Sequence, residues 1–532
     1  MIRTLTSLHR NQIVSARESS SENGRKAMND LYDACVIGSG PGGAVAAATL
    51  ALEGKKVLLI ERGPFVAPEK VNFRVLDMSN KFGHVETTSG YRTVLYQGSA
   101  LGGSSMIFGA VAMKPQPFTF DDWSERSGVS SINVETLEPH YRHVAEIMSV
   151  TRQTKELENR PNAIVREMAV ALGKEDDLVL VNRYTSGCAG VGLCNFGCGM
   201  DLKGNMINSF LPLALETGNL TVLTDCEAEA IVGQQSQSGW QARAVVVSTK
   251  GATGGKSAKT LIRTRTVVVA GGAFFSSAIL LRSPGLPNRH LIGSKIYLQP
   301  HAQIFALFDE PVTKRGVFEK GQYVPNNGVP AIYNFLGFLR DQHFWWLASI
   351  LYPASLASFI SSLRPDEHFD IMKRFHHTMS VTVTVKDDPA KSRIVVKDGR
   401  AQLSFEESQQ DIESFRHCFR AAAEGFLAVG ARRVFLPLLR PPTIQSQADL
   451  KKIDSLDFTY NDLILYSDHT SGGNQFGADI RRGVTDERGR VFGTTNVFVS
   501  DSSLFPAAPG VNPSWTIMAL TRHVAMGMLN GS

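Results

Sequence analysis

A glycine spacing near the start of the chain constrains its fold more than any other feature. Residues 32–37 are an apolar run that predicts a buried strand, and Gly38, Gly40 and Gly43 follow it as G-x-G-x-x-G. Residues 44–52 are helix formers without a breaker. In such a unit the first glycine permits a tight turn, the second lets the backbone approach a pyrophosphate, and the third lets the helix pack closely on the strand. The pattern predicts a dinucleotide site at a helix N-terminus.

The next apolar segment strengthens this prediction. Residues 56–60 read as a second strand, and Glu61 and Arg62 follow it directly. A carboxylate about twenty residues after the glycines can accept hydrogen bonds from an adenosine ribose. A glycine triplet alone can be a structural turn. A strand, glycines, a helix, a second strand and a terminal acid in register favour dinucleotide binding instead.

Three later segments suit a flavin dinucleotide. Gly102, Gly103, Ser104 and Ser105 lie in a glycine- and serine-rich loop that permits close approach of a large planar ligand. Residues 266–273 are another apolar run ending in glycines. Asp501 follows a β-branched run, which is expected to bring this acid close to a ribityl or phosphate group.

Together with the run from His469 to Leu520, these segments resemble the glucose–methanol–choline (GMC) oxidoreductases. The C-terminal part of the resemblance includes Gly-Val-Asn-Pro-Ser at 510–514 and Ile-Met-Ala-Leu at 517–520. The resemblance implies an α/β and α+β fold, with a discontinuous Rossmann-like FAD domain and a substrate domain built on an antiparallel sheet. It also implies FAD as cofactor and hydride transfer from an alcohol to flavin.

The family pattern assigns the candidate catalytic residues. His469, in His-x-x-Gly, matches the general base, and Asn512 matches the His-or-Asn partner that holds the substrate oxygen. Pro513, next to Asn512, is counted with the cofactor-binding residues. A histidine suits the base because its ordinary pKa is about 6.5. The remaining histidines lack this context, and we expect structural roles for them: His301, His376, His377 and His523.

Two departures from the family pattern bear on the flavin. Some relatives attach FAD covalently through a histidine just after the Gly102–Gly103 loop, where this chain has Ile107 or Phe108. We therefore expect non-covalent FAD. Many relatives have Thr where this chain has Gly473. The choice between oxidase and dehydrogenase stays open.

The patterning along the chain predicts interleaved domains. Residues 28–120, 205–300 and 463–532 are assigned to the FAD domain, and residues 121–204 and 301–462 to the substrate domain with a Cys-rich loop. Residues 1–27 are expected to form a surface extension. Residues 378–385 and 392–396 alternate as strands of a separate sheet, and residues 411–426 read as an amphipathic helix.

Two segments allow more than one interpretation. Cys188, Cys194 and Cys198 are favoured as packing residues over ligands of an iron–sulfur cluster or of zinc, since no fourth ligand lies nearby in sequence. Residues 344–363 carry no charge. We interpret them as a buried helix pair, or else as an apolar lid that makes a peripheral membrane contact, rather than as a membrane span.

Composition limits the partners. The chain has 532 residues, a net charge of +5 and no long basic block, which argues against nucleic-acid binding. No secretory signal is evident and six cysteines do not make a secreted disulfide framework, so a cytoplasmic location is expected. The favoured activity is FAD-dependent oxidation of a primary or secondary, partly apolar alcohol, with oxygen or an unidentified electron acceptor. The alternatives are a sugar or polyol dehydrogenase that reduces a quinone, cytochrome or iron–sulfur centre, and a flavin-dependent lyase or non-redox flavoprotein.

Overall fold

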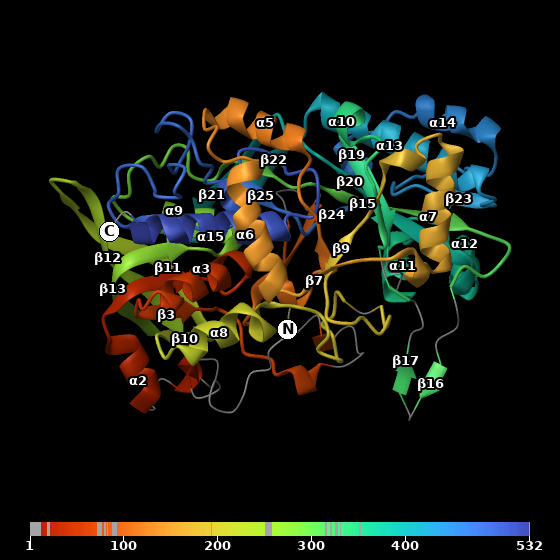
Figure 1. Ribbon diagram of the computed structural model, residues 1–532. Coiled ribbons are helices and arrows are strands. Elements are labelled where there is room, and N and C mark those ends of the chain that lie inside the picture. The colour runs from red at the N-terminus through yellow and green to blue at the C-terminus, as the bar shows by residue number, and fades with distance from the viewer. Residues whose placement is uncertain are drawn as a thin grey trace.

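The computed structural model describes the chain except residues 1–11, 19–21, 72–76, 79–80, 82, 88–92, 193, 250–257, 314–316, 320–321, 325–327, 330, 350–352 and 531–532. Two large sheets organise the described residues, one toward each end of the molecule in Figure 1. Each carries its own buried apolar core. The predicted combination of a Rossmann-like unit and a second sheet domain is confirmed.

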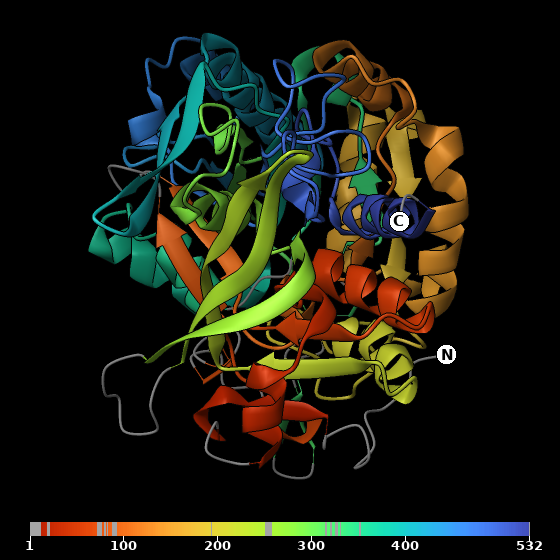
Figure 2. The same ribbon diagram turned by 90° about the vertical axis from the view of Figure 1, so that its left-hand side faces the viewer.

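The first sheet, called here the parallel sheet, has eight strands in the order β1-β10-β3-β2-β13-β12-β11, with β26 paired to β13. Its strands are β1 (Ile13–Ser15), β2 (Tyr32–Ile37), β3 (Val57–Ile60), β10 (Leu220–Thr224), β11 (Cys226–Ser236), β12 (Gly239–Thr249), β13 (Ala258–Val269) and β26 (Val497–Val499). The strands from β1 to β13 along this order, together with β26, run parallel, whereas β11 and β12 add an antiparallel extension. Figure 2 shows this extension toward the viewer.

Helices bury the parallel sheet. The helix α3 (Pro41–Leu52) begins directly after β2 and is buried along most of its length. The C-terminal helix α15 (Ser514–Asn530) packs on α3 and on α6 (Val134–Ile147). Figure 1 shows α15 crossing near α6 at the centre of the molecule. Because α15 follows the Gly510–Asn512 loop, its packing fixes where that loop lies.

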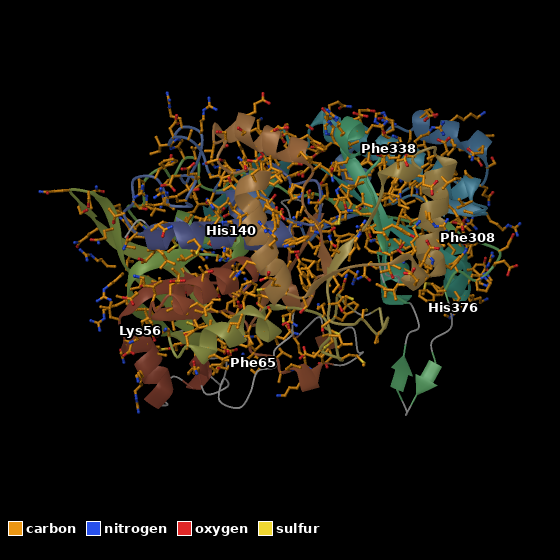
Figure 3. The ribbon with its side chains drawn as sticks, viewed as in Figure 1. Lys56, Phe65, His140, Phe308, Phe338 and His376 are labelled. Atoms are coloured by element: carbon orange, nitrogen blue, oxygen red, sulfur yellow. The ribbon has the colours of Figure 1, made fainter. Side chains whose placement is uncertain are left out.

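The second sheet, called here the antiparallel sheet, has nine strands in the order β4-β5-β24-β15-β20-β19-β18-β8, with β23 paired to β15. Its strands are β4 (Gly83–Thr87), β5 (Thr93–Gly98), β8 (Leu178–Leu180), β15 (His301–Leu307), β18 (Tyr333–Phe335), β19 (Phe344–Ala348), β20 (Thr378–Val385), β23 (Arg433–Phe435) and β24 (Leu465–Ser467). The β24–β5 pair is parallel. The helices α7 (Arg160–Ala171) and α13 (Gln409–Ala428) cover the antiparallel sheet. Figure 3 labels Phe308 and Phe338, which pack in the core of this sheet, on the opposite side of the molecule from Lys56.

Smaller sheets and short helices complete the described fold. The smaller sheets are β22-β21-β14-β25 (Arg400–Glu406, Lys391–Lys397, Ser294–Tyr297, Ser471–Gly473), β6-β9-β7 (Val111–Ala112, Asn182–Tyr184, Val150–Arg152) and β16-β17 (Val317–Glu319, Gln322–Val324). The further α-helices are α2 (Glu22–Asn29), α5 (Pro117–Ser127), α8 (Phe210–Glu216), α9 (Gly272–Arg282), α10 (Leu339–Gln342), α11 (Pro353–Phe359), α12 (Pro365–Lys373) and α14 (Lys451–Asp454).

The domain limits expected from the sequence differ from these sheets in several places. In the segment 1–27, expected to be a surface extension, the described residues 13–15 form β1, which pairs with β10 at the edge of the parallel sheet. Within 28–120, β4 and β5 belong to the antiparallel sheet, and so does β24, beyond residue 463. Within 121–204, α6 packs on the first core through Leu137 and Tyr141. The sheet or core that each segment joins depends on contacts between distant parts of the chain, and sequence patterning does not reveal these contacts.

Two local predictions are also wrong. Residues 344–363 do not form a helix pair: β19 is a central strand of the antiparallel sheet, and α11 follows it after residues 350–352, which lie outside the described residues. Residues 378–385 and 392–396 lie in different sheets, as β20 and β21. The predicted helix at 411–426 is confirmed as part of α13.

Candidate active site

A cavity of about 900 Å³ is lined by residues from both large sheets. Most of the predicted site residues line it: Gly38, Gly40, Glu61, Arg62, Gly103, Ser104, His469, Asp501, Asn512 and Pro513. Gly43, Gly102 and Ser105 do not. Residues from position 38 to position 513 therefore line one cavity, and Gly43, Gly102 and Ser105 lie behind its lining.

The glycine loops form a close backbone cradle at one end of this cavity. Gly38 has a φ of +99°, and a side chain there would meet the Ala270 carbonyl oxygen at 2.4 Å. A Cβ on Gly43 would lie 1.8 Å from the Gly38 carbonyl oxygen, so Gly43 serves the packing of α3 on β2. A Cβ on Gly103 would lie 2.6 Å from the Cα of Gly40. This bare backbone at the start of α3 fits a pyrophosphate.

A hydrogen-bond chain ties the two glycine loops to the predicted ribose acid. The Gly102 N–H donates to Ser39 Oγ at 2.9 Å, and Ser39 Oγ donates to Glu61 Oε2 at 2.6 Å. Glu61 Oε1 accepts from the Gly63 N–H at 2.8 Å. Burial raises the pKa of Glu61, although its donors oppose that shift. A carboxylate oxygen accepts two hydrogen bonds, which leaves Oε1 able to accept one from a ribose hydroxyl.

Asp501 lines the cavity, and protein groups hydrogen-bond both of its carboxylate oxygens. Its Oδ1 accepts from the backbone N–H and the hydroxyl of Ser503, and its Oδ2 accepts from Gly272 N–H and Ser276 Oγ. These four donors fill the acceptor positions of a carboxylate. Asp501 therefore fastens the start of α9 to the loop after β26, and shapes the cavity wall without a free acceptor for a ligand. Ser105 is similar: its hydroxyl donates to Gly102 and accepts from the Met206 N–H.

The two predicted catalytic residues meet in the cavity. His469 Nε2 lies 3.2 Å from Asn512 Nδ2, and the tautomer that leaves Nε2 unprotonated accepts this amide hydrogen. Asn512 Oδ1 is buried and has no partner within the described part of the chain. The Trp345 ring lies nearly parallel to the His469 ring, with centroids 6.4 Å apart. A hydroxyl group entering here can donate its one hydrogen to His469 Nε2, and its oxygen can accept the second hydrogen of Asn512 Nδ2.

The imidazole of His469 is held in its neutral form. Burial lowers its pKa to about 3, and this effect outweighs the nearby Asp468 carboxylate, which acts in the opposite direction. The carboxylate Oδ1 of Asp468 lies 3.4 Å from His469 Nε2. A neutral imidazole is the form that accepts a proton.

Gln299 and Asp387 position His469, and sequence reasoning missed both. Gln299 Nε2 lies 3.3 Å from His469 Nδ1, which is a packing contact in the tautomer that leaves Nε2 unprotonated, because both groups then carry hydrogens. The same carboxamide bonds the backbone of Gly510 and Val511. Gln299 has a φ of +43°, and Asp387 accepts from its N–H at 2.8 Å. This turn connects the loop of Asn512 to the ring of His469. The only signal in the sequence is Gln-Pro-His at 299–301, since a residue before proline avoids the right-handed helical region.

His301 and Asp468 were missed as site residues as well. His301 lines the cavity, and its Nε2 lies 2.6 Å from Asp468 Oδ1. Its ring meets the His469 ring edge-on, with centroids 4.5 Å apart. The sequence predicts a structural role for His301, whereas the structure places its side chain in the cavity lining, against His469. The first position of β15 gave no sign of this, because β15 and the turn before His469 meet only in the folded chain.

The cysteine-rich loop lies beside this centre. Arg183 Nη2 is 3.4 Å from Cys194 Sγ, and the buried Lys203 ammonium donates to the Cys194 carbonyl oxygen at 2.8 Å. Burial lowers the pKa of Lys203 to about 8. Among the described His, Cys, Asp and Glu side chains, the three whose ligand atoms all lie within 4.8 Å of one another are His301, Asp468 and His469. The three loop cysteines do not form such a group, and two cations stand close to them.

None of the described helices has the length and apolar character needed to cross a membrane.

Solved structures share this fold. Pyridoxine 4-oxidase from Mesorbium loti superposes with a TM-score of 0.68 at 16% identity, covering 94% of this chain and 99% of that one. A formate oxidase variant from Aspergillus oryzae superposes with a TM-score of 0.70 at 14% identity, covering 95% and 99%. At these identities the likeness concerns the fold alone.

Sequence comparisons place the chain more narrowly. An uncharacterised GMC-type oxidoreductase, y4nJ, of Sinorhizobium fredii is 27% identical over 94% of this chain and 95% of its own length. The long-chain-alcohol oxidase FAO3 of Arabidopsis thaliana is 26% identical over 94% of this chain and 68% of its own length. Two family models described as GMC oxidoreductase match residues 38–301 and 381–521, and between them they cover most of the chain. The chain belongs to the GMC oxidoreductase family.

Proposed function

We propose that this protein oxidises a primary or secondary, partly apolar alcohol to an aldehyde or ketone, with His469 as the general base. FAD is the cofactor that the family uses, and the glycine cradle and Glu61 fit its dinucleotide part. The observation that carries the proposal is the pairing of a buried, neutral His469 with Asn512 in the cavity that the cradle opens into.

The residues divide the chemistry as follows. FAD, when bound, supplies the acceptor for the hydride that leaves the carbinol carbon. His469 Nε2 accepts the hydroxyl proton, so the ring becomes an imidazolium. Asn512 Nδ2, beside that nitrogen, donates its second hydrogen to the substrate oxygen. Asp468, 3.4 Å from Nε2, stabilises the positive charge as it forms.

The long-chain-alcohol oxidases among the relatives support an alcohol as substrate. Aromatic side chains in the lining support a partly apolar one: Phe275, Phe305, Trp345 and Phe359. Non-covalent attachment of FAD is part of the proposal, because Ile107 and Phe108 line the cavity where some relatives carry the linking histidine. Oxygen or another acceptor would reoxidise the flavin.

Anaerobic mixing with a panel of alcohols tests the proposal. The flavin absorbance of the purified holoenzyme should fall with at least one alcohol, and the aldehyde or ketone should appear in equal amount. A lyase or non-redox flavoprotein would leave the flavin oxidised with every alcohol. Iron in the protein and reduction of a quinone or cytochrome, but not of oxygen, would favour the sugar or polyol dehydrogenase instead.

A further inference from the structure

The antiparallel sheet turns a row of polar side chains toward the cavity. In the pairing of β15 with β20, His301 lies opposite Thr384 and Gln303 lies opposite Thr382. On the other side of β20, Trp345 of β19 lies opposite Thr384. All five residues line the cavity. Because side chains alternate along a strand, His301 and Gln303 face the same way, about 6.6 Å apart along β15.

Two members of this row have an unmet hydrogen-bonding atom: Trp345, at the level of His301, through its Nε1, and Gln303, one step further along, through its Oε1. The side chain of Gln303 is 5% exposed, and its Nε2 donates to Thr382 Oγ1 and to Tyr466 Oη, each at 2.8 Å. Its Oε1 is buried and has no partner among the residues that the structure describes. Buried polar atoms in native proteins are nearly always paired. An acceptor left over at a cavity wall therefore indicates a ligand group.

Aromatic rings line the same cavity, and one of them, Tyr466, bonds this amide. The Phe305 ring, two residues further along β15, lies 6.0 Å from the Phe359 ring of α11. Phe359 lies 5.7 Å from Tyr466, which in turn lies 6.1 Å from Tyr96, between ring centroids. All four rings line the cavity. They suit a compact apolar body beside one fixed hydrogen-bonding group.

The distance from the reacting centre sets where that group belongs on a substrate. The His301 ring touches the His469 ring, so the carbinol at His469 lies at the level of His301. Gln303 stands one step further along the strand, at about 6.6 Å. This rise along the backbone of β15 is similar to the separation of two oxygens carried on opposite sides of a six-membered ring.

We propose that Gln303 forms a second substrate subsite, which binds a hydroxyl group across a six-membered ring from the alcohol that is oxidised. This inference rests on the proposed function. The hydroxyls of Thr382 and Tyr466 can donate or accept, so the amide can present either its oxygen or its NH₂ group to the cavity, and a hydroxyl pairs with both. A plain alkyl chain would leave the amide unpaired.

Binding to the reduced enzyme tests this subsite without turnover. The holoenzyme is photoreduced under anaerobic conditions, and dissociation constants are measured by calorimetry for 4-(hydroxymethyl)cyclohexanol and cyclohexylmethanol, which differ by one hydroxyl. The diol should bind about 10- to 100-fold more tightly, as expected for a hydrogen bond to a buried polar group.

Two variants separate recognition from structure. Gln303→Met keeps the length of the side chain and should bring the two dissociation constants within threefold of each other. Phe305→Leu, on the same strand face, should weaken both compounds by a similar factor and keep their ratio. Circular dichroism and FAD content confirm that each variant is folded.

Equal constants in the wild-type enzyme, or a ratio that Gln303→Met leaves intact, would overturn the subsite. These outcomes do not depend on chemistry, because the flavin is already reduced. The proposed function fails in a different assay: the oxidised enzyme would then keep its flavin oxidised with every alcohol of the panel.

Discussion

His469 and Asn512 are 43 positions apart in the chain, yet His469 Nε2 lies 3.2 Å from Asn512 Nδ2. Each residue reaches this contact from its own anchored segment. His469 follows β24 and contacts Gln299, whereas Asn512 precedes α15, which packs on α3 and α6. The packing of two distant parts of the chain thus builds the pair on which the proposed chemistry depends.

Replacing His469 by alanine should slow flavin reduction by alcohol about 10²- to 10⁴-fold, the usual contribution of a general base, while FAD stays bound. Asn512→Ala should cost about tenfold, because it removes one hydrogen bond and no proton acceptor. Anaerobic stopped-flow reduction measures both. His523→Ala is the matched control: this ring packs against His140 outside the cavity lining, and its loss should change the rate less than threefold. A His469→Ala rate within threefold of wild type would mean that the base is elsewhere.

Protonation of His469 should not slow flavin reduction by alcohol in mildly acidic solution. The pKa of His469 is lowered from an ordinary 6.5 to about 3 by burial, so the ring stays neutral well below pH 6.5. The same shift has a cost in stability. In the unfolded state His469 binds a proton near pH 6.5, whereas in the folded state it binds one only near pH 3. The contribution of His469 to the free energy of unfolding is therefore present above pH 6.5 and is lost as pH falls toward about 3. The pH profile of the reductive rate constant checks the first statement: an acidic limb centred at about pH 6.5 that remains after His301, the other histidine lining the cavity, is replaced would contradict it.

Asp468→Asn should reduce the rate of flavin reduction about tenfold at neutral pH, because the imidazolium formed on His469 loses a neighbouring negative charge. Asp468→Glu keeps the charge and should recover part of the rate. If the asparagine and glutamate variants are equally slow, the effect of Asp468 is steric rather than electrostatic. Melting temperatures of both variants show whether the fold is affected.

Acid precipitation should release the FAD into the supernatant, since Ile107 and Phe108 offer no histidine for a covalent link. Absorbance of the supernatant and of the dissolved pellet measures the distribution. Yellow colour that remains in the washed pellet would show a covalent bond formed by another residue.

Glu61→Gln should weaken FAD retention by about 1.5–3 kcal/mol, the range for hydrogen bonds to a charged group. The new amide would also turn an N–H toward one of the donors that Glu61 now accepts from, Ser39 or Gly63. FAD content after gel filtration and its dissociation constant are the measurements. The surface exchange Glu53→Gln, at the end of α3, provides the control and should leave both unchanged.

Anaerobically purified protein should contain well under one iron per chain, because Cys188, Cys194 and Cys198 do not gather their sulfur atoms with a further ligand and two cations lie beside them. Plasma emission spectrometry gives the metal content. Near-stoichiometric iron with absorbance beyond the flavin bands would instead favour the dehydrogenase alternative.

The local units of this protein can be predicted from neighbouring residues alone. The glycine triplet and Glu61 stand one strand apart, so local geometry alone brings them to the same end of the sheet, and the hydrogen bonds through Ser39 follow from that short separation. The amphipathic helix at 411–426 likewise follows from a 3.6-residue period within one segment.

Which distant segments line the same side of the cavity could not be predicted in this way, because it depends on the packing of the whole fold. An apolar run without charge is consistent with a buried helix or a buried strand, and pairing with β20 and β18 made 344–348 a strand. His301, Gln303 and Asp468 carry no motif, because their role depends on which strands become neighbours and which face turns to the cavity. Asp501 matched a ligand-binding pattern, but four protein donors occupy its oxygens. Sequence patterns encode contacts a few residues apart, whereas the pairing of strands hundreds of residues apart is settled by the total burial and hydrogen bonding of the folded chain.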